Sequence, residues 1–289
     1  MLWLVVVLRV LANPCSNALQ KVLAGRGIRP LLVIGFAHLG LTLLAIPWLV
    51  LHRLPASPVF WWNLGASAAL ATLANTLIVY AVRRADLSLV GPVNSFKPIV
   101  SLLPGWLLLG ERPTLAGLAG IALVVAGSCL LQPRGAGRPS LRSLFADRGV
   151  QLRVAALIPS AIEAVFLKRA LALANSAEVF VAWAILGLGA AGIALVVGRG
   201  FRDFRPQISR GVSNFPGLAA LVLTTGVMQF CTVIALAELQ VGYALALFQT
   251  SSVVTVLLGW AWFGETDFRR RLAAASVMAA GAAVIVLAR

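Results

Sequence analysis

"LPGWLLLGE", residues 103–111, and "LLGWAWFGE", residues 257–265, share the spacing G-W-x3-G-E, and this pair decides how the chain is organised. Aligned without gaps, Trp106 falls on Trp260, and the flanking glycines and the closing glutamates also coincide. Such a spacing at corresponding places in the two halves predicts an internal repeat, with one copy in each half.

The composition places this repeat in a membrane. Of the 289 residues, 60% are hydrophobic and only 11% are charged, whereas a soluble fold must cover its surface with polar side chains. The apolar runs suit helices, which need about 20 residues to cross a bilayer, and they alternate too rarely for a membrane barrel. We predict ten spans, at roughly residues 2–23, 31–51, 60–82, 88–110, 114–132, 152–173, 177–197, 213–237, 241–263 and 268–288.

The longest polar connection divides the predicted spans into five and five. It gives a first repeat at residues 1–132, a connecting loop at 133–150 and a second repeat at 151–289. Because each repeat has an odd number of spans, the second enters the membrane from the opposite side. The predicted fold class is an all-α membrane protein of ten transmembrane helices in two inverted five-helix repeats. In secondary transporters such repeats provide two states, each open to one side.

The basic residues predict the orientation. The net charge is +15, and most lysines and arginines lie in the odd-numbered connections between spans. The positive-inside rule places these connections in the cytoplasm and both termini outside. Since a topology signal accounts for the charge, we expect no nucleic-acid partner.

Two longer stretches resemble a known family. Residues 80–114, "YAVRRADLSLVGPVNSFKPIVSLLPGWLLLGERPT", and residues 247–265, "LFQTSSVVTVLLGWAWFGE", are similar to the drug/metabolite transporter (DMT) superfamily in its EamA-like branch. The resemblance covers essentially the whole chain. It implies a proton-coupled or facilitative carrier of small metabolites, often an exporter, with a central cavity lined by helices 1, 3, 4, 6, 8 and 9. Members are usually drawn with both termini in the cytoplasm, the reverse of the orientation that the charges predict.

Two ionisable side chains lie near the middle of predicted spans. Lys97 is in the fourth span and Glu163 in the sixth, and an ionised side chain at the bilayer centre costs about 2.5–3.5 kcal/mol on insertion scales. We predict that they face the central cavity, where Lys97 receives an anionic substrate group and Glu163 binds a substrate amine or exchanges a proton. A static ion pair that fixes helix packing is the alternative.

Further polar and aromatic residues are candidates for substrate contact. Pro98 frees the carbonyl group of Asn94, four residues earlier, for a polar contact with a ligand. Trp106 and Trp260 would gate or line the cavity, or else anchor the helix at the membrane interface. The remaining candidates are uncharged polar residues within spans, which elsewhere often only join helices: Asn13, Asn17, Asn75, Gln229 and Gln249.

Three further features rank below these candidates. Arg9 ranks below Lys97, because its side chain could snorkel to the near surface. Glu111, at the membrane edge, would pair with Arg112 or cap the next helix. The small-residue faces of the fifth and tenth spans would pack within one chain or form a homodimer contact, and the sequence favours neither.

The sequence therefore predicts an integral membrane secondary transporter of small metabolites, amino-acid-like or other small organic solutes, that exports by alternating access. We expect a bacterial inner (plasma) membrane, contact with membrane lipid, a possible coupled proton, and no cofactor or metal. The alternatives are a channel, an intramembrane enzyme or a scaffold without carrier activity. An enzyme is disfavoured because the chain has no H-E-x-x-H motif and only two histidines.

Overall fold

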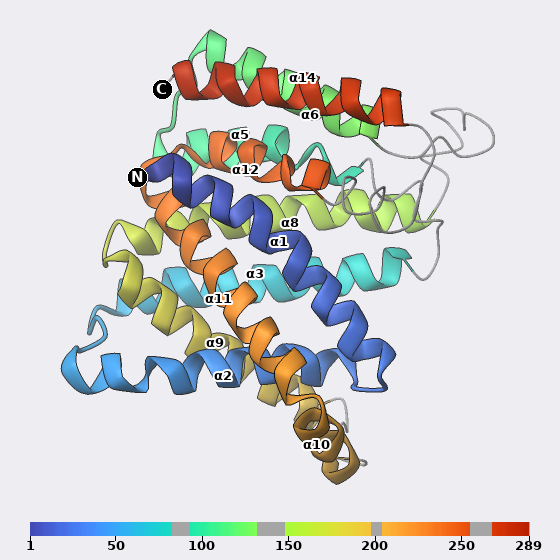
Figure 1. The fold of residues 1–289 in the computed structure, drawn as a ribbon. Helices are drawn as coiled ribbons and strands as arrows, with labels where there is room; N and C mark the ends of the chain where they lie inside the picture. The colour runs from blue at the N-terminus through green and yellow to red at the C-terminus, as the bar shows by residue number, and fades with distance from the viewer. Residues whose placement is uncertain (83–92, 132–147, 198–203, 255–267, 289) are drawn as a thin grey trace. The chain divides into compact units, whose positions relative to one another are not determined.

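Helices account for all regular secondary structure in the part of the chain that the structure describes. The structure, a computed structural model, describes residues 1–82, 93–131, 148–197, 204–254 and 268–288 (Figure 1). The helices are α1 (Leu2–Gly25), α2 (Pro30–Leu51), α3 (Pro58–Val82), α5 (Lys97–Leu109), α6 (Leu115–Leu131), α8 (Arg148–Leu171), α9 (Ser176–Val197), α10 (Phe204–Ser213), α11 (Phe215–Glu238), α12 (Val241–Gln249) and α14 (Phe268–Leu287).

All of these helices except α10 fall within or close to the predicted spans. Within the described residues, five helices are long and apolar enough to cross a membrane: α1, α2, α8, α9 and α11. Four shorter helical stretches are also apolar, among them α5 and α6. The predicted all-helical membrane class is therefore confirmed.

The helices group into two compact units, and each unit takes segments from both predicted repeats. Unit 1 consists of Met1–Ala68 and Ala170–Ala237, and unit 2 consists of Ala69–Arg169 and Glu238–Arg289. Unit 1 thus contains α1, α2, α9 and α10, and unit 2 contains α5, α6, α12 and α14. The boundaries between the units fall within α3, α8 and α11.

Unit 1 is built around the packing of α1, α2, α9 and α11. A buried apolar cluster joins the end of α1 and the start of α2 to the later helices, through Leu23, Val33, Leu195 and Leu221. On α2, Gly40 lies so close to α11 that a Cβ atom there would approach a Val222 methyl carbon to 2.5 Å. Apolar burial and close helix approach therefore hold this unit together.

Unit 2 contains a seam of glycines between α6 and α14, which lie side by side in Figure 1. A Cβ atom on Gly120 would lie 2.9 Å from the backbone oxygen of Gly281, and one on Gly281 would lie 2.7 Å from that of Gly120. Because only hydrogen fits there, the two backbones touch. The small-residue faces of the fifth and tenth spans thus pack against each other within one chain.

The fourth span is not the continuous helix predicted for residues 88–110. Ser95 and Phe96 form a turn, and α5 begins at Lys97 with Pro98 in its first turn. Proline lacks an N–H group and crowds the carbonyl group four residues earlier, so the helix stops and starts again. The ninth span also has a turn, at Thr250 after the end of α12. In the ungapped alignment of the repeats, these two breaks fall at equivalent positions.

Candidate substrate site

The two ionisable residues predicted for the site lie together in unit 2. Lys97 is the first residue of α5, just after the helix break, and Glu163 is on α8. The Lys97 Nζ and Glu163 Oε2 atoms are 3.9 Å apart, and the side chains are 20% and 23% exposed. This distance is at the outer limit of an ion pair, so the two charges compensate each other without a short hydrogen bond.

A second ion pair in unit 2 has a different geometry. Lys168 Nζ donates to Glu111 Oε1 at 2.7 Å and to the carbonyl oxygen of Leu239 at 2.6 Å. The Glu111 carboxylate also accepts the N–H of Val241, the first residue of α12, at 2.8 Å to Oε2 and 3.1 Å to Oε1. A carboxylate at a helix N-terminus accepts from an otherwise unpaired backbone N–H group, and its negative charge interacts favourably with the helix dipole. Glu111 therefore caps α12 and pairs with Lys168. The predicted pairing with Arg112 and the predicted cap of the helix that follows Glu111 in the chain are both wrong.

The two helix breaks are joined by a hydrogen bond. Gln249 Nε2 donates to the carbonyl oxygen of Asn94 at 2.8 Å, and α5 and α12 lie side by side (Figure 1). The carbonyl group freed by Pro98 is thus bonded to a side chain of the other repeat. The contact of this carbonyl group with a ligand stays a prediction, and a carbonyl oxygen has a second lone pair with which to accept it.

The predicted polar residues of α1 and α11 lie in unit 1. These helices run alongside each other with Arg9 Nε donating to Thr232 Oγ1 at 3.4 Å, and with a 2.8 Å hydrogen bond between the Ser16 and Thr225 hydroxyl groups. Arg9 therefore contacts α11 within unit 1. Of the predicted site residues on these helices, Gln229 is buried, Asn13 is half-buried and Asn17 is exposed.

Sequence reasoning missed the polar line formed by Arg9, Ser16, Thr225 and Thr232. A signal was present, because Arg9, Asn13, Ser16 and Gln20 recur at intervals of three or four residues, which places them on one helix face. Read together, they would have predicted that this face of α1 meets another helix.

The remaining candidates are not brought together by any described contact. Asn75 is exposed on α3, and Trp106 is exposed on α5. Trp260 lies outside the described residues, as does the second G-W-x3-G-E motif. Within the described residues, no group of three or more His, Cys, Asp or Glu side chains could hold a metal ion.

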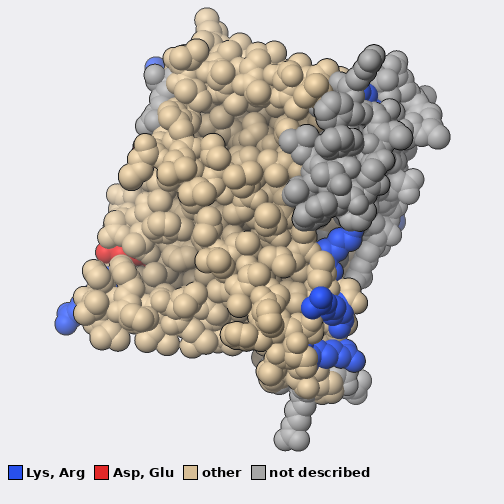
Figure 2. Space-filling model, in the orientation of Figure 1, with Lys and Arg blue, Asp and Glu red and all other residues tan. Residues whose placement is uncertain are grey.

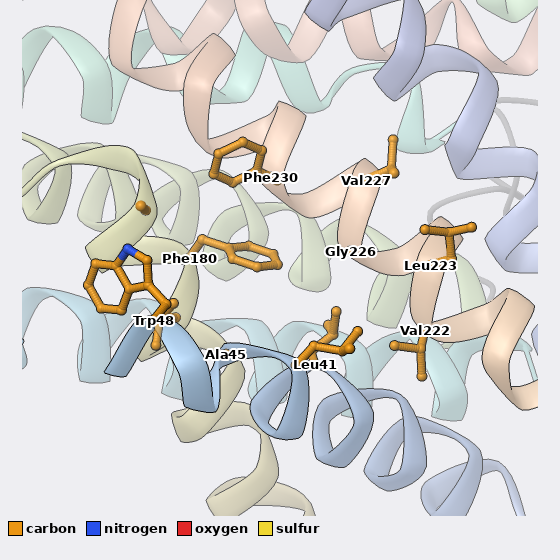
Figure 3. Close-up of a pocket in the computed structure, with 12 residues that line it drawn as sticks. Leu41, Ala45, Trp48, Phe180, Val222, Leu223, Gly226, Val227 and Phe230 are labelled. Atoms are coloured by element: carbon orange, nitrogen blue, oxygen red, sulfur yellow. The ribbon is translucent and has the colours of Figure 1, made fainter. Parts of the chain in front are cut away.

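Unit 1 also contains an apolar pocket of about 430 Å3 between α2, α9 and α11. Figure 3 shows Trp48 and Phe180 at one end of it and Val222 and Leu223 at the other, with Phe230 above. No charged side chain lines it. A pocket of this kind suits hydrocarbon and offers no partner for a charged solute.

The fold is that of a polytopic membrane protein. Two of its predicted spans are interrupted, and an ion pair lies within the spans. The sequence model of the EamA-like transporter family matches residues 15–132 and again 147–287. The chain belongs to the EamA-like transporter family, whose members are membrane transporters and not enzymes. This match confirms the resemblance to the DMT superfamily and the two-repeat architecture.

A solved structure supports the same fold. A crystal structure of another protein matches 98% of this chain and 96% of its own, with a TM-score of 0.72 and 19% sequence identity. At that identity the likeness concerns the fold alone. Among curated proteins, none matches the sequence.

Proposed function

We propose that this membrane transporter is a secondary carrier that moves small amino-acid-like or other small organic solutes by alternating access, with Lys97 and Glu163 as its binding centre. The observation that carries the proposal is the 3.9 Å separation of their charged groups, inside the spans and beside a helix break. Broken helices place backbone and side-chain polar groups at membrane depth in many carriers.

The contrast between the two ion pairs of unit 2 supports a functional role for this one. The Lys168–Glu111 pair is 2.7 Å long and is held by further bonds to the backbone, as expected of a structural contact. The Lys97 Nζ and Glu163 Oε2 atoms are farther apart, at 3.9 Å, and both side chains keep partial exposure. A solute can therefore exchange with its partner groups at smaller cost.

Charge balance favours a substrate that carries both signs. A zwitterion inserted between the two residues would place its carboxylate on Lys97 and its ammonium group on Glu163, so the site stays neutral both empty and loaded. A protonated Glu163 with an anion on Lys97 gives the same balance and would couple transport to a proton. Neutrality matters because an uncompensated charge at the bilayer centre is costly. A carrier passes through both the empty and the loaded state in each cycle, so the site must be neutral in both.

The proposal extends to direction, orientation and assembly. Export is the direction that the family resemblance favours. The charge bias supports an orientation in a bacterial plasma membrane with the basic connections in the cytoplasm. The repeats are taken as 1–132 and 151–289, with a homodimer as the proposed assembly. The other residues proposed to contact substrate, directly or from the rim, are Asn13, Asn17, Asn75, Asn94, Gln229, Gln249, Trp106 and Trp260.

Substrate and site are tested together by thermal shift. The purified protein is screened against a metabolite library, since a ligand that binds the folded state raises the melting temperature with its concentration. We expect zwitterionic solutes to give the largest shifts. Lys97→Ala and Glu163→Gln should abolish the shift, whereas Asn17→Ala, at an exposed site on α1, should reduce it less. Normal shifts in both charge variants would place the site elsewhere.

Counterflow in proteoliposomes tests the mechanism. Labelled solute outside should accumulate transiently when unlabelled solute is trapped inside, because alternating access exchanges one for the other. A channel would equilibrate the label without accumulation, and a scaffold would not move it. An imposed pH gradient then tests proton coupling, because the gradient should drive uptake by the native protein. Uptake that does not respond to the gradient would refute proton coupling.

A further inference from the structure

The short helix α10 is fixed to the turn between α1 and α2. Gln207, which is buried, accepts the backbone N–H of Arg29 at 3.0 Å and donates to the carbonyl oxygen of Gly27 at 3.2 Å. One turn later, a Cβ atom on Gly211 would lie 3.1 Å from the Phe36 ring. Hydrogen bonding and close packing thus hold one face of α10 against the end of the spanning helices.

A second face of α10 carries apolar side chains that remain exposed. Ile208 and Val212 are four residues apart and share one face of α10, and Phe215 is the first residue of α11. They are 38%, 70% and 67% exposed, respectively. Exposed apolar groups of this extent, at the start of a membrane-spanning helix, are expected to contact lipid.

Basic side chains lie beside this apolar face. Lys21, Arg26 and Arg210 are exposed, and Figure 2 shows blue side chains gathered at this end of the molecule while the middle of the visible face carries none. Arg26 Nη1 donates to Asn214 Oδ1 at 2.6 Å, and Arg210 Nη1 donates to the carbonyl oxygen of Gly27 at 3.0 Å. Each guanidinium group has five N–H donors, so both remain able to bind a phosphate. Residues 19–29 and 204–215 include no Asp or Glu.

We propose that α10 and the α1–α2 turn form a binding surface for anionic phospholipids. Lys21, Arg26 and Arg210 bind the headgroup phosphate, and the apolar side chains of α10 and Phe215 enter the upper part of the acyl region. An amphipathic helix with one basic and one apolar face lies in the plane of the membrane in this way. The surface makes this end of unit 1 selective for lipid charge.

A lipid is favoured over a soluble partner by the arrangement of the two faces. Electrostatic attraction alone would also draw nucleic acid or an acidic protein. Those partners do not require exposed apolar residues beside the cations, and α10 leads directly into the spanning helix α11. The same leaflet supplies both the charge and the hydrocarbon that this surface fits.

The test is lipid binding by the purified full-length protein in detergent, read by native mass spectrometry and by melting temperature. Titration with phosphatidylglycerol should give more bound lipid and a larger rise in melting temperature than phosphatidylcholine. Each basic residue near an anionic surface contributes about fivefold in affinity. The triple variant Lys21→Gln, Arg26→Gln, Arg210→Gln should therefore bind phosphatidylglycerol on the order of 100-fold more weakly, and its preference should vanish.

Three controls make the result decisive. Arg53→Gln removes an exposed arginine just beyond the other end of α2 and should leave the preference intact. Arg26 and Arg210 also form hydrogen bonds within the chain, so the triple variant could lose stability as well as lipid binding. The single variants Lys21→Gln and Val212→Ser change only exposed side chains, and each should weaken lipid binding severalfold in a folded protein. Inorganic phosphate should not reproduce the rise. Equal binding of the two lipids, an unchanged triple variant, an equal loss in Arg53→Gln, or an equal rise with phosphate would each overturn the proposal.

Discussion

Replacement of Glu111 by glutamine should destabilise the protein without removing substrate binding. The change leaves one oxygen acceptor for the Val241 N–H and takes away the negative charge that faces Lys168. Loss of one partner from a buried ion pair costs about 3–5 kcal/mol. Because the Lys168 side chain is 21% exposed and keeps its bond to the Leu239 carbonyl group, it regains part of its hydration. We therefore expect about 3 kcal/mol, the lower end of that range.

A double-variant cycle measures this cost. Unfolding of Glu111→Gln, Lys168→Met and the double variant is followed in detergent under identical conditions, and the double variant should be less destabilised than the sum of the single ones by about 2 kcal/mol. The looser pair provides the matched control, since Lys97→Met and Glu163→Gln should couple by less than about 1 kcal/mol. Coupling energies in the reverse order would refute the distinction between a structural and a functional pair.

Three further outcomes are expected. Gly120→Leu should lower the free energy of unfolding, measured by thermal unfolding, by about 1–3 kcal/mol or more, because a backbone oxygen of α14 occupies the space that the side chain needs. Gly189→Ala, with nothing within 4 Å of its added carbon, should not lower it. Unchanged stability of Gly120→Leu would contradict the close contact of the α6 and α14 backbones. Gln249→Leu should cost about 1 kcal/mol by chemical denaturation, since it leaves a carbonyl group unpaired; equal denaturation midpoints for Gln249→Leu and the native chain would show that the bond contributes nothing. In a cysteine-free background, Ser209→Cys should resist an impermeant thiol reagent in intact cells while Ala56→Cys reacts; the opposite pattern would reverse the orientation.

The spans could be predicted because each depends on a local property of the chain. A run of about 20 apolar residues crosses a bilayer whatever lies around it, so hydropathy alone located α1 and α11 to within a few residues. The helix α10 escaped prediction because it is short and half polar, and its stability depends on bonds from Gln207 to a distant turn. The break at Ser95 was signalled by Pro98, although proline alone does not distinguish a kink from an interruption.

The sequence predicted the two charged residues of the candidate site, but it did not predict several of the contacts around them. Lys97 and Glu163 stood out because ionised groups are costly in lipid, and their sequence separation did not hide the pairing. The partners of Glu111 and of the Asn94 carbonyl group come from the other repeat, 130 and 155 residues along the chain. Only the folded arrangement brings such groups together, so the local sequence did not indicate these partners.

The interleaving of the two compact units has a consequence for how the protein is made. Unit 1 joins Met1–Ala68 to Ala170–Ala237, so α1 and α2 leave the ribosome about a hundred residues before the helices that they pack against. During that interval Ser16 has no Thr225 to bond and Gly40 has no Val222 to contact. The first two helices must wait in the bilayer for partners still being synthesised, and insertion of the second half of the chain completes the fold of the first.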